Sequence, residues 1–395
     1  MAAARAVATD LSCTPGRVRV LQIMEATIGG TKRHLYDLVT HLDPAHFDVE
    51  VACPRRRSEP HGDTSFVDDL RAAAVTVRPI PMVRALRPVA DGRSIVALAA
   101  LIRRGRFDLV HTHSTKAGLL GRLAARARPA TRVVHSPHGF YFLNFEAPWP
   151  RAAYRAMERG LGRLTHRLIA LSTGEQALAA TVVAPAKVRL IPNSFERFTP
   201  LPAAEARVRL GLPPAAPVVG TTARFTRQKA PFDIVEAFAA IHQAQPDVRF
   251  VWINDGELRA AVLRRLAERG LLEATALPGY VPNARELLPA MDVFLHLARW
   301  EGIPYAVMEA MTAGVPVVGA AAIGTSDLIE DRVTGRLIPP GDPAAAARAA
   351  VELLTHPTKA RTIRAAAERS VAKHHDPAAM VRATEQVYFE LIRRS

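Results

Sequence analysis

The chain has 395 residues, of which 49% are hydrophobic, and a formal net charge of +15. This length predicts two domains, because one ordinary hydrophobic core does not grow to such a size. The two cysteines, Cys13 and Cys53, exclude a disulfide framework and favour a reducing, cytoplasmic setting. No stretch reaches the roughly 18 apolar residues of a membrane span, so the chain is not expected to cross a bilayer.

The positive charge points to an anionic partner. Nucleic acid, an anionic membrane surface and phosphorylated small molecules are the three candidates. The arginines are spread along the chain, and no zinc-finger, basic-zipper or RNA-binding sequence pattern accompanies them. Charge alone therefore leaves all three classes open.

The first half of the chain alternates predicted strands with helical stretches. Residues 1–16 contain Arg5 and Asp10 and lack a continuous apolar run, so we expect a disordered tail rather than a signal peptide. A strand at 17–24 is followed by a Gly29–Gly30 turn and a helix. Further strands are predicted at 47–53, 75–80, 107–113, 131–136, 166–172 and 187–192. This alternation is typical of parallel βαβ units and predicts an N-terminal domain over 17–195.

The second half repeats the pattern after a proline-rich linker at 194–217, which also contains one short predicted helix. Strands follow at 218–225, 248–253, 274–279, 291–297 and 315–320. We predict an α/β fold of two Rossmann-like domains, each a doubly wound parallel sheet, that face a central cleft. The second domain covers 196–372, and a C-terminal helix within 373–395 packs back on the first domain. In such sheets ligands bind beyond the carboxyl ends of the strands.

One strand-to-helix loop of the second domain contains two glutamates in the segment EGIPYAVMEAMTAG. Pro304 suits the first turn of a helix, and Gly314 suits its end. Glu301 then precedes the helix, while Glu309 lies about 8 Å along its axis. A glutamate on an apolar helix is usually a solvated edge residue. The pair also suits a nucleotide sugar, because the helix N-terminus binds the diphosphate and carboxylates accept hydrogen bonds from hydroxyls on both sides.

Another loop of the second domain contains two cations, Arg224 and Lys229. It follows the predicted strand at 218–225 and ends before Pro231. Two cations there could hold a diphosphate and neutralise a leaving group. A solvated basic loop is the alternative explanation of the same residues.

Two loops of the first domain offer weaker signals. Gly29 and Gly30 would let the backbone approach a phosphate or a sugar, although an ordinary tight turn needs glycine too. His138 follows the predicted strand at 131–136, where a packed or surface histidine is also common. His111 and His113 have no carboxylate or thiolate at ligand spacing nearby, so we expect no metal.

Together these segments resemble glycosyltransferase family 4, a group of retaining enzymes with the GT-B architecture. The similarity covers roughly residues 17–390. EGIPYAVMEAMTAGVPVV is similar to the family's E-x7-E motif, and ARFTRQKAP to its basic donor loop. VHTHSTKAGLLGRLAA (110–125) and HGF (138–140) look like members that build bacterial polysaccharides or modify lipid-linked or small-molecule acceptors.

The resemblance implies transfer of a sugar, with retention, from a nucleotide-diphosphate-sugar, preferably of UDP, to a hydroxyl acceptor. It implies a catalytic set of Arg224, Lys229, Glu301 and His138. It implies a donor-binding set of Gly29, Gly30, Gly256, Gly279, Tyr280, Val281, Gly302, Ile303, Pro304, Tyr305 and Glu309. In these sets the cations hold the diphosphate, Glu309 binds the ribose, Glu301 binds the donor sugar, and 279–281 lie against the nucleobase. No metal or other cofactor is implied.

Three positions depart from the family pattern. Asn254 stands where glycine is common, Ser194 follows Asn193 in place of glycine, and Arg299 occupies a position that often holds a small residue. A non-hydrolysing nucleotide-sugar epimerase is the main alternative function, and it would convert the donor without an acceptor. A phosphorylase is usually longer and needs a pyridoxal-phosphate lysine that cannot be assigned here. A nucleic-acid-binding protein rests on the charge alone, so no nucleic acid is expected.

Arginines of the first domain suggest a further partner. Arg84, Arg87, Arg103, Arg104, Arg106 and the arginines of 151–163 could dock the protein on an anionic membrane that holds a lipid-linked acceptor. Solubility and a genomic bias toward arginine explain them equally well. The expected location is cytoplasmic, with peripheral attachment to the inner face of the plasma membrane as the second possibility.

Overall fold

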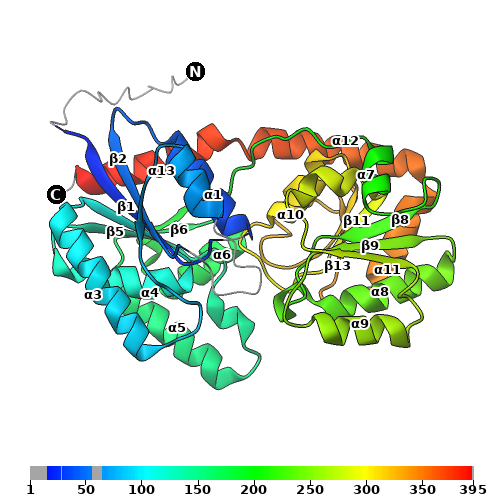
Figure 1. Ribbon diagram of the computed structural model, residues 1–395, viewed down its shortest axis with the longest axis horizontal. Coiled ribbons are helices and arrows are strands. Elements are labelled where there is room, and N and C mark those ends of the chain that lie inside the picture. Colours follow the sequence, from blue (N-terminus) through cyan, green and yellow to red (C-terminus); the bar gives the residue numbers. More distant parts are fainter. Residues whose placement is uncertain (1–15, 28, 56–64, 394–395) are drawn as a thin grey trace, which may run out of the picture.

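The computed structural model describes residues 16–27, 29–55 and 65–393. The predicted tail, apart from Gly16, lies outside these residues. Two parallel sheets form two domains that lie side by side (Figure 1). The prediction of two doubly wound α/β domains is confirmed.

The first sheet has seven strands in the order β3-β2-β1-β4-β5-β6-β7. Their bounds are β1 Val18–Met24, β2 Phe47–Cys53, β3 Thr76–Pro79, β4 Leu109–His113, β5 Arg132–Ser136, β6 Arg167–Ala170 and β7 Val188–Leu190. Helices α1 Gly29–His41, α2 Ser65–Ala72, α3 Pro88–Gly105, α4 Ser114–Ala124, α5 Pro148–Gly162 and α6 Thr173–Ala179 connect them. The central strands are largely buried, because both faces of a parallel sheet are covered, and they contain buried polar side chains such as Gln22, His111 and His135 as well as apolar ones.

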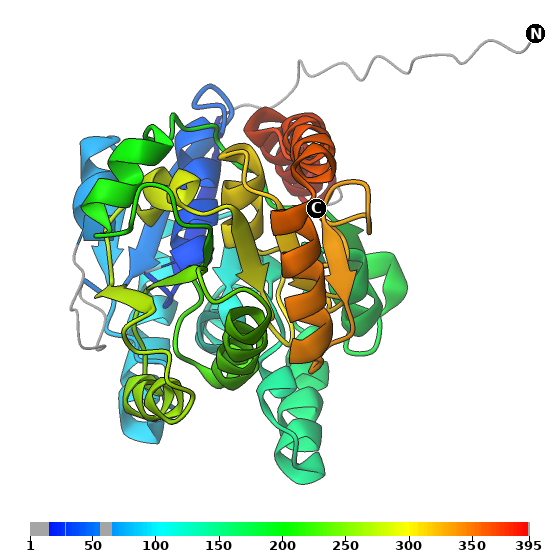
Figure 2. The same ribbon diagram turned by 90° about the vertical axis from the view of Figure 1, so that its right-hand side faces the viewer.

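The second sheet has six strands in the order β10-β9-β8-β11-β12-β13. Their bounds are β8 Val218–Thr221, β9 Arg249–Ile253, β10 Thr275–Gly279, β11 Val293–His296, β12 Val317–Ala320 and β13 Arg336–Ile338. Helices α7 Ala203–Arg209, α8 Pro231–Ala244, α9 Arg259–Glu268, α10 Tyr305–Thr312, α11 Pro343–Thr355 and α12 Pro357–His374 complete the domain and lie on both sides of the strands (Figure 2). The three-residue edge strand β13 is absent from the predicted strands, since so short a run has little sequence signal.

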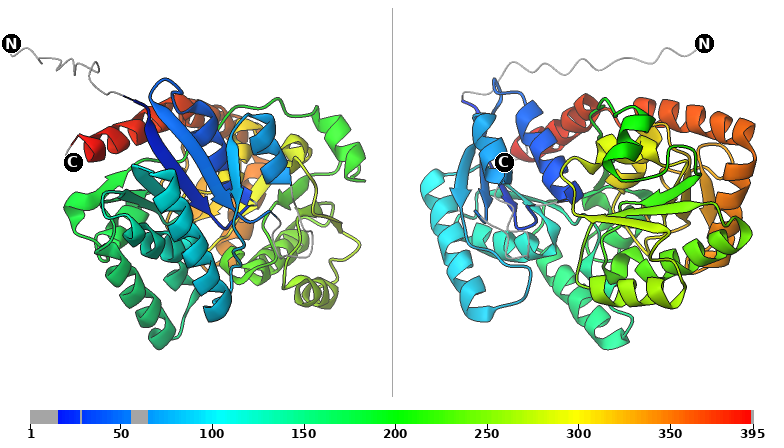
Figure 3. Two further views of the ribbon diagram at one scale, coloured as in Figure 1. Left: turned by 60° about the vertical axis from the view of Figure 1, so that its left-hand side comes forward. Right: turned by 45° about the vertical axis from the view of Figure 1, so that its right-hand side comes forward.

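The last helix, α13 (Pro377–Ile392), belongs to the core of the first domain although it follows the whole second domain. Met380, Val381 and Leu391 pack in one buried cluster with residues of β1 and β4. Asp376 caps its N-terminus by accepting from the backbone N–H of Ala379 at 3.0 Å, and Pro377 starts the first turn. Figures 1 and 3 show α13 beside α1. Among the described helices, none combines the length and apolar composition that spanning a membrane requires.

Candidate active site

An ion pair of the second domain lies at the carboxyl edge of its sheet. Lys229 ends a short 3-10 turn before α8, and its ammonium contacts the Glu301 carboxylate. The Lys229 and Glu301 side chains are only 15% and 11% exposed. Gln228 Nε2 donates to the carbonyl oxygen of Trp300 at 2.9 Å and so ties the two loops together. The two predicted residues therefore form one charged unit.

Glu301 is held in its ionised form by its neighbours. Burial alone would raise its pKa, but the Lys229 ammonium and His296, whose Nε2 lies 3.5 Å from Glu301 Oε1, bring the pKa down to about 2. His296 ends β11, so the sheet itself positions this third group. The arrangement offers a fixed carboxylate for ligand hydroxyls and, in Lys229, a cation that can turn to a phosphate.

The N-terminus of α10 lies just after Glu301 in the sequence. Pro304 is its N-cap residue, with its own φ at −76°, and the helix ends before Gly314, whose φ is +70°, as predicted. Among the described residues the Glu309 carboxylate has no hydrogen-bond or ion-pair partner, and burial raises its pKa. The Tyr305 hydroxyl is buried and also has no hydrogen-bond partner there. Unsatisfied polar groups beside a helix N-terminus are free to bind a polar ligand.

The first domain brings a histidine loop against this helix start. His138 adopts a left-handed conformation, with φ of +54°, so that Gly139 can approach the second domain. A Cβ atom on Gly139 would lie 3.7 Å from the backbone nitrogen of Gly302. Glu175 fixes the loop, because its Oε1 accepts from the Gly139 N–H at 2.6 Å. The structure therefore places His138 and Glu301, predicted from distant segments, on two facing loops.

Gly30 makes the second close approach between the domains. A Cβ atom at Gly30 would lie 2.7 Å from Cδ2 of Tyr305, so only glycine fits beside this ring. Gly29, with φ of +71°, has nothing within 4 Å of such an atom and supplies the turn itself. Glycine is thus needed at the two positions for different reasons, a close contact at Gly30 and a positive φ at Gly29.

Substituting Gly30 by alanine is expected to destabilise the protein by about 1–3 kcal/mol, because the added methyl overpacks the ring of Tyr305. Thermal unfolding would measure this loss. Gly92→Ala is the matched control, since Gly92 lies in α3 with open space around its Cα. Equal melting temperatures for the two variants would contradict the close contact.

Two imidazoles, those of His34 and His113, lie close to the ring of His138. One ring nitrogen from each of His34, His113 and His138 lies within 4.8 Å of the other two. Burial lowers the pKa of all three, to about 4 for His34, so they are neutral at physiological pH. Three neutral imidazoles could ligate a metal ion. His113 Nδ1 lies 3.0 Å from His138 Nε2, a separation at which two ring nitrogens share one proton in a hydrogen bond.

The other predicted residues line the loops beyond β8, β9 and β10. Arg224 follows β8, and the carbonyl oxygen of Gly279 accepts from the Asn254 N–H at 2.8 Å. Asn254 has φ of +137°, a region that favours glycine, and its Nδ2 donates to the Thr222 carbonyl oxygen at 3.2 Å. A Cβ atom on Gly256 would meet the backbone oxygen of Phe225 at 2.7 Å. These contacts explain why glycine is needed at 256, whereas asparagine is tolerated at 254.

Tyr280 is 50% exposed and Val281 packs partly on the core of the second domain. An exposed ring next to a packed aliphatic side chain is a surface on which a planar base can stack.

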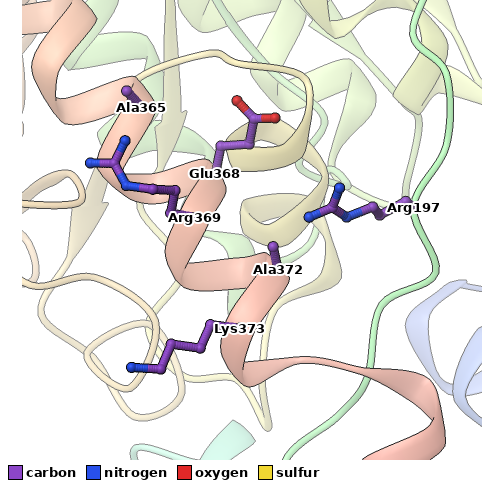
Figure 4. A pocket seen from close by; sticks show the side chains of 6 residues that line it. All are labelled: Arg197, Ala365, Glu368, Arg369, Ala372 and Lys373. Atoms are coloured by element: carbon purple, nitrogen blue, oxygen red, sulfur yellow. The ribbon is translucent and has the colours of Figure 1, made fainter.

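A pocket of about 390 Å³ lies elsewhere, between the linker and α12 (Figure 4). Arg197 of the linker lines it together with Glu368, Arg369 and Lys373 of α12. None of the predicted site residues lines it. Instead, Glu301, Gly302 and Tyr305 of the second domain lie against Gly30, His138 and Gly139 of the first.

Sequence reasoning missed His296 and Glu175. His296 lies at the carboxyl end of a predicted strand, so the rule on strand ends could have found it. Glu175 stands three residues after Ser172, a spacing typical of a capping box, and Ser172 Oγ does accept from the Glu175 N–H at 3.0 Å. Its carboxylate, however, bonds Leu171 and Gly139, which only the fold brings within reach.

Two facing Rossmann-like domains are the architecture of GT-B transferases, and in this chain an ion pair joins two loops at the edge of the second sheet. The family described as Glycosyltransferase Family 4 matches residues 28–196, and that described as Glycosyl transferases group 1 matches 216–356. The chain belongs to glycosyltransferase family 4 and is a glycosyltransferase.

Curated relatives cover most of the chain. It is 29% identical, over 83% of this chain and 86% of the relative, to the Escherichia coli UDP-Gal:α-D-GlcNAc-diphosphoundecaprenol α-1,3-galactosyltransferase. It is 31% identical, over 76% and 75%, to the 2-deoxystreptamine N-acetyl-D-glucosaminyltransferase of Streptomyces fradiae. The crystal structure of Anabaena HepE with UDP and glucose superposes with a TM-score of 0.80 at 20% identity, covering 95% of this chain and all of that one. The predicted GT-B fold and the resemblance are confirmed, and the epimerase alternative is not favoured.

Proposed function

We propose that this glycosyltransferase moves a hexosyl or related sugar from a UDP-sugar to a hydroxyl acceptor with retention of anomeric configuration. The Lys229–Glu301 pair beside the free start of α10 supports the proposal most directly. It offers a cation for the diphosphate and a carboxylate for the sugar within one unit. The E. coli relative is named for a UDP-galactose donor, which favours UDP.

The residues divide the work by their chemistry. Arg224 and Lys229 bind the diphosphate and neutralise the charge that grows as it leaves. Glu301 accepts hydrogen bonds from the donor sugar, and Glu309, which lacks a protein partner among the described residues, accepts them from the ribose. Tyr280 stacks on the base.

The acceptor domain completes the site. Gly30 lets the backbone approach the diphosphate, and His138 lies beside the reacting sugar. Attack of the acceptor hydroxyl from the face that the diphosphate leaves would retain configuration without a carboxylate nucleophile. Trapping a covalent glycosyl-enzyme adduct would contradict this step.

Incubation with UDP-galactose, UDP-glucose and UDP-N-acetylglucosamine, together with a lipid-linked or aminocyclitol acceptor, tests the proposal. We expect one donor to yield an α-linked product, read from the anomeric proton coupling by NMR. An inverted product would contradict retention. Donor conversion without acceptor would indicate the epimerase instead.

Nucleotide binding gives an independent test. UDP at 100 times its dissociation constant should raise the free energy of unfolding by about 2.7 kcal/mol, more than ADP, GDP or TDP at equal concentration. A larger shift from another nucleotide would reassign the donor. Because we propose a metal-independent reaction, turnover should survive EDTA, and its loss with recovery on adding Mg²⁺ or Mn²⁺ would contradict this.

A membrane surface is the second element of the proposal. Trp149, Val89 and Val96 of the first domain are 76%, 73% and 69% exposed and lie among exposed arginines of α3 and α5. Apolar side chains among cations suit an anionic bilayer that presents a lipid-linked acceptor. We expect sedimentation with phosphatidylglycerol vesicles at low salt and much less with phosphatidylcholine vesicles. Equal binding to both would exclude electrostatic docking at the inner face of the plasma membrane.

A further inference from the structure

Tyr388 of the C-terminal helix places its hydroxyl inside the first domain. The residue is fully buried, and its oxygen contacts two polar side chains of the sheet. Gln22 of β1 donates to it from Nε2 at 2.9 Å, and His111 Nδ1 of β4 lies 2.7 Å away. Gln22 and Tyr388 are 366 residues apart in sequence. In a buried core, each polar group of such a contact needs a hydrogen-bond partner, because an unpaired one costs stability.

The contact continues toward the candidate active site. Gln22 Oε1 lies 2.8 Å from His113 Nε2, and His113 Nδ1 lies 3.0 Å from His138 Nε2. Gln22 and His113 are both fully buried, so water does not compete for these groups. An unbroken chain of hydrogen bonds therefore runs from α13 to His138.

The orientation of Gln22 fixes the proton on each ring. Its carbonyl oxygen can only accept, so His113 must have its hydrogen on Nε2. His113 Nδ1 is then an acceptor, and His138 must donate to it from Nε2. His138 Nδ1 is left with its lone pair and has no hydrogen bond to any described residue.

The branch through His111 obeys the same rule. Because Tyr388 accepts from Gln22, its own hydrogen is available to His111 Nδ1. His111 then donates from Nε2 to Ser136 Oγ, which lies 2.9 Å away. Each donor in this chain meets one acceptor, so the protein specifies one tautomer for each ring.

We propose that Tyr388 and Gln22 are positioning residues that hold His138 as the neutral tautomer with hydrogen on Nε2, so that Nδ1 accepts a hydrogen bond from a hydroxyl of the donor sugar. The proposal rests on the proposed function for its last step only. The C-terminal helix thus takes part in sugar recognition without touching the sugar. By holding the Tyr388 hydroxyl in place, it determines which ring nitrogen of His138 has the hydrogen.

Imidazole ¹⁵N chemical shifts test the tautomers without any turnover. In the wild-type protein we expect His113 and His138 to show a protonated Nε2 and an unprotonated Nδ1 at pH 7.5, with assignments from His113→Gln and His138→Gln. The opposite pattern would mean that Gln22 has its amide reversed, and it would overturn the proposal. Stoichiometric Zn²⁺ binding that shifts all three rings of the His34, His113 and His138 cluster would also overturn it.

Kinetics test the role of the helix residue. Tyr388→Phe leaves Gln22 Nε2 without an acceptor, and we expect kcat to fall about tenfold while the affinity for UDP is unchanged. Gln22→Met, of similar size and without hydrogen bonds, should lower kcat at least as much. Val387→Ala is the matched control, because Val387 is buried on the same helix and outside the chain of hydrogen bonds. It should lower the melting temperature with kcat unchanged.

The outcomes separate this proposal from the proposed function. Equal losses of kcat in Tyr388→Phe and Val387→Ala would indicate a packing role and overturn the positioning role. Tautomers as expected in a wild-type protein that transfers no sugar from any UDP-sugar would contradict the proposed function, and with it the sugar contact of Nδ1, while the assignment of the hydrogen-bond chain would stand.

Discussion

Replacing Lys229 by alanine is expected to lower kcat by about 100- to 1000-fold, the range found when one preorganised charge-stabilising group is removed. Lys229 is the cation that pairs with Glu301 at the candidate donor site, and both side chains are largely buried. Without it the diphosphate leaves with less of its charge neutralised. Steady-state kinetics with the preferred UDP-sugar would measure the effect, and the stabilisation by UDP should fall in the same variant.

The second domain contains a control for this substitution. Lys359 also contacts a carboxylate, that of Glu352, but the pair lies away from the loops of the candidate site. Lys359→Ala is expected to keep both kcat and the UDP shift. If Lys229→Ala retained full turnover, or if the two variants behaved alike, the donor site would not lie where we place it.

Acid should destabilise the protein through its buried histidines. Burial lowers the pKa of His34 from 6.5 to about 4, and it holds the pKa of His111, His113, His135 and His138 well below 6.5. The unfolded chain therefore binds more protons than the native state below pH 6.5, and the free energy of unfolding falls as pH falls. For His34 alone the loss between pH 6.5 and 4 is about 3 kcal/mol.

Buried carboxyl groups, among them Asp37, Glu175 and Glu309, act in the opposite sense. Burial raises the pKa of Asp37 to about 6 and that of Glu175 to about 7, so their protonation favours the native state as pH falls. A comparison of variants removes this contribution. Urea unfolding at pH 6.5 and 4.5 should show a smaller loss for His34→Gln than for wild type, whereas His356→Gln, on the surface, should match wild type. Equal losses in all three proteins would show that His34 is not buried in its neutral form.

The sequence was most informative where the residues that determine a local structure all lie within one short segment. Glu301, Pro304, Glu309 and Gly314 stand in fourteen consecutive residues whose helix start and end follow from proline and glycine, and α10 has those bounds. The Arg224–Lys229 loop is equally local. Strand and helix order followed from hydrophobic alternation, so the two doubly wound sheets were predictable.

Close approaches between the domains could not be predicted in the same way. The sequence suggested glycine at 30 for a phosphate, and the structure also places the ring of Tyr305 against it. His138 was singled out by its place after a strand, while Glu175, which anchors the adjacent Gly139, was not. The Gly30–Tyr305 contact depends on how the two sheets face one another, and the Glu175–Gly139 contact depends on the pairing of β5 with β6 in the first sheet.

The sequence by itself determined the fold class and the family, and it indicated the loops that we propose as the donor site, because local propensity and short motifs act within a few residues. Only the tertiary structure decided how His138 is oriented, since Tyr388 reaches Gln22 across 366 residues through a helix that returns from the second domain. Side-chain hydrogen bonds depend on differences in distance of a few tenths of an ångström and on which nitrogen of each imidazole has the hydrogen. No sequence pattern predicts these distances and proton positions, because they depend on how α13 packs in the core of the first domain.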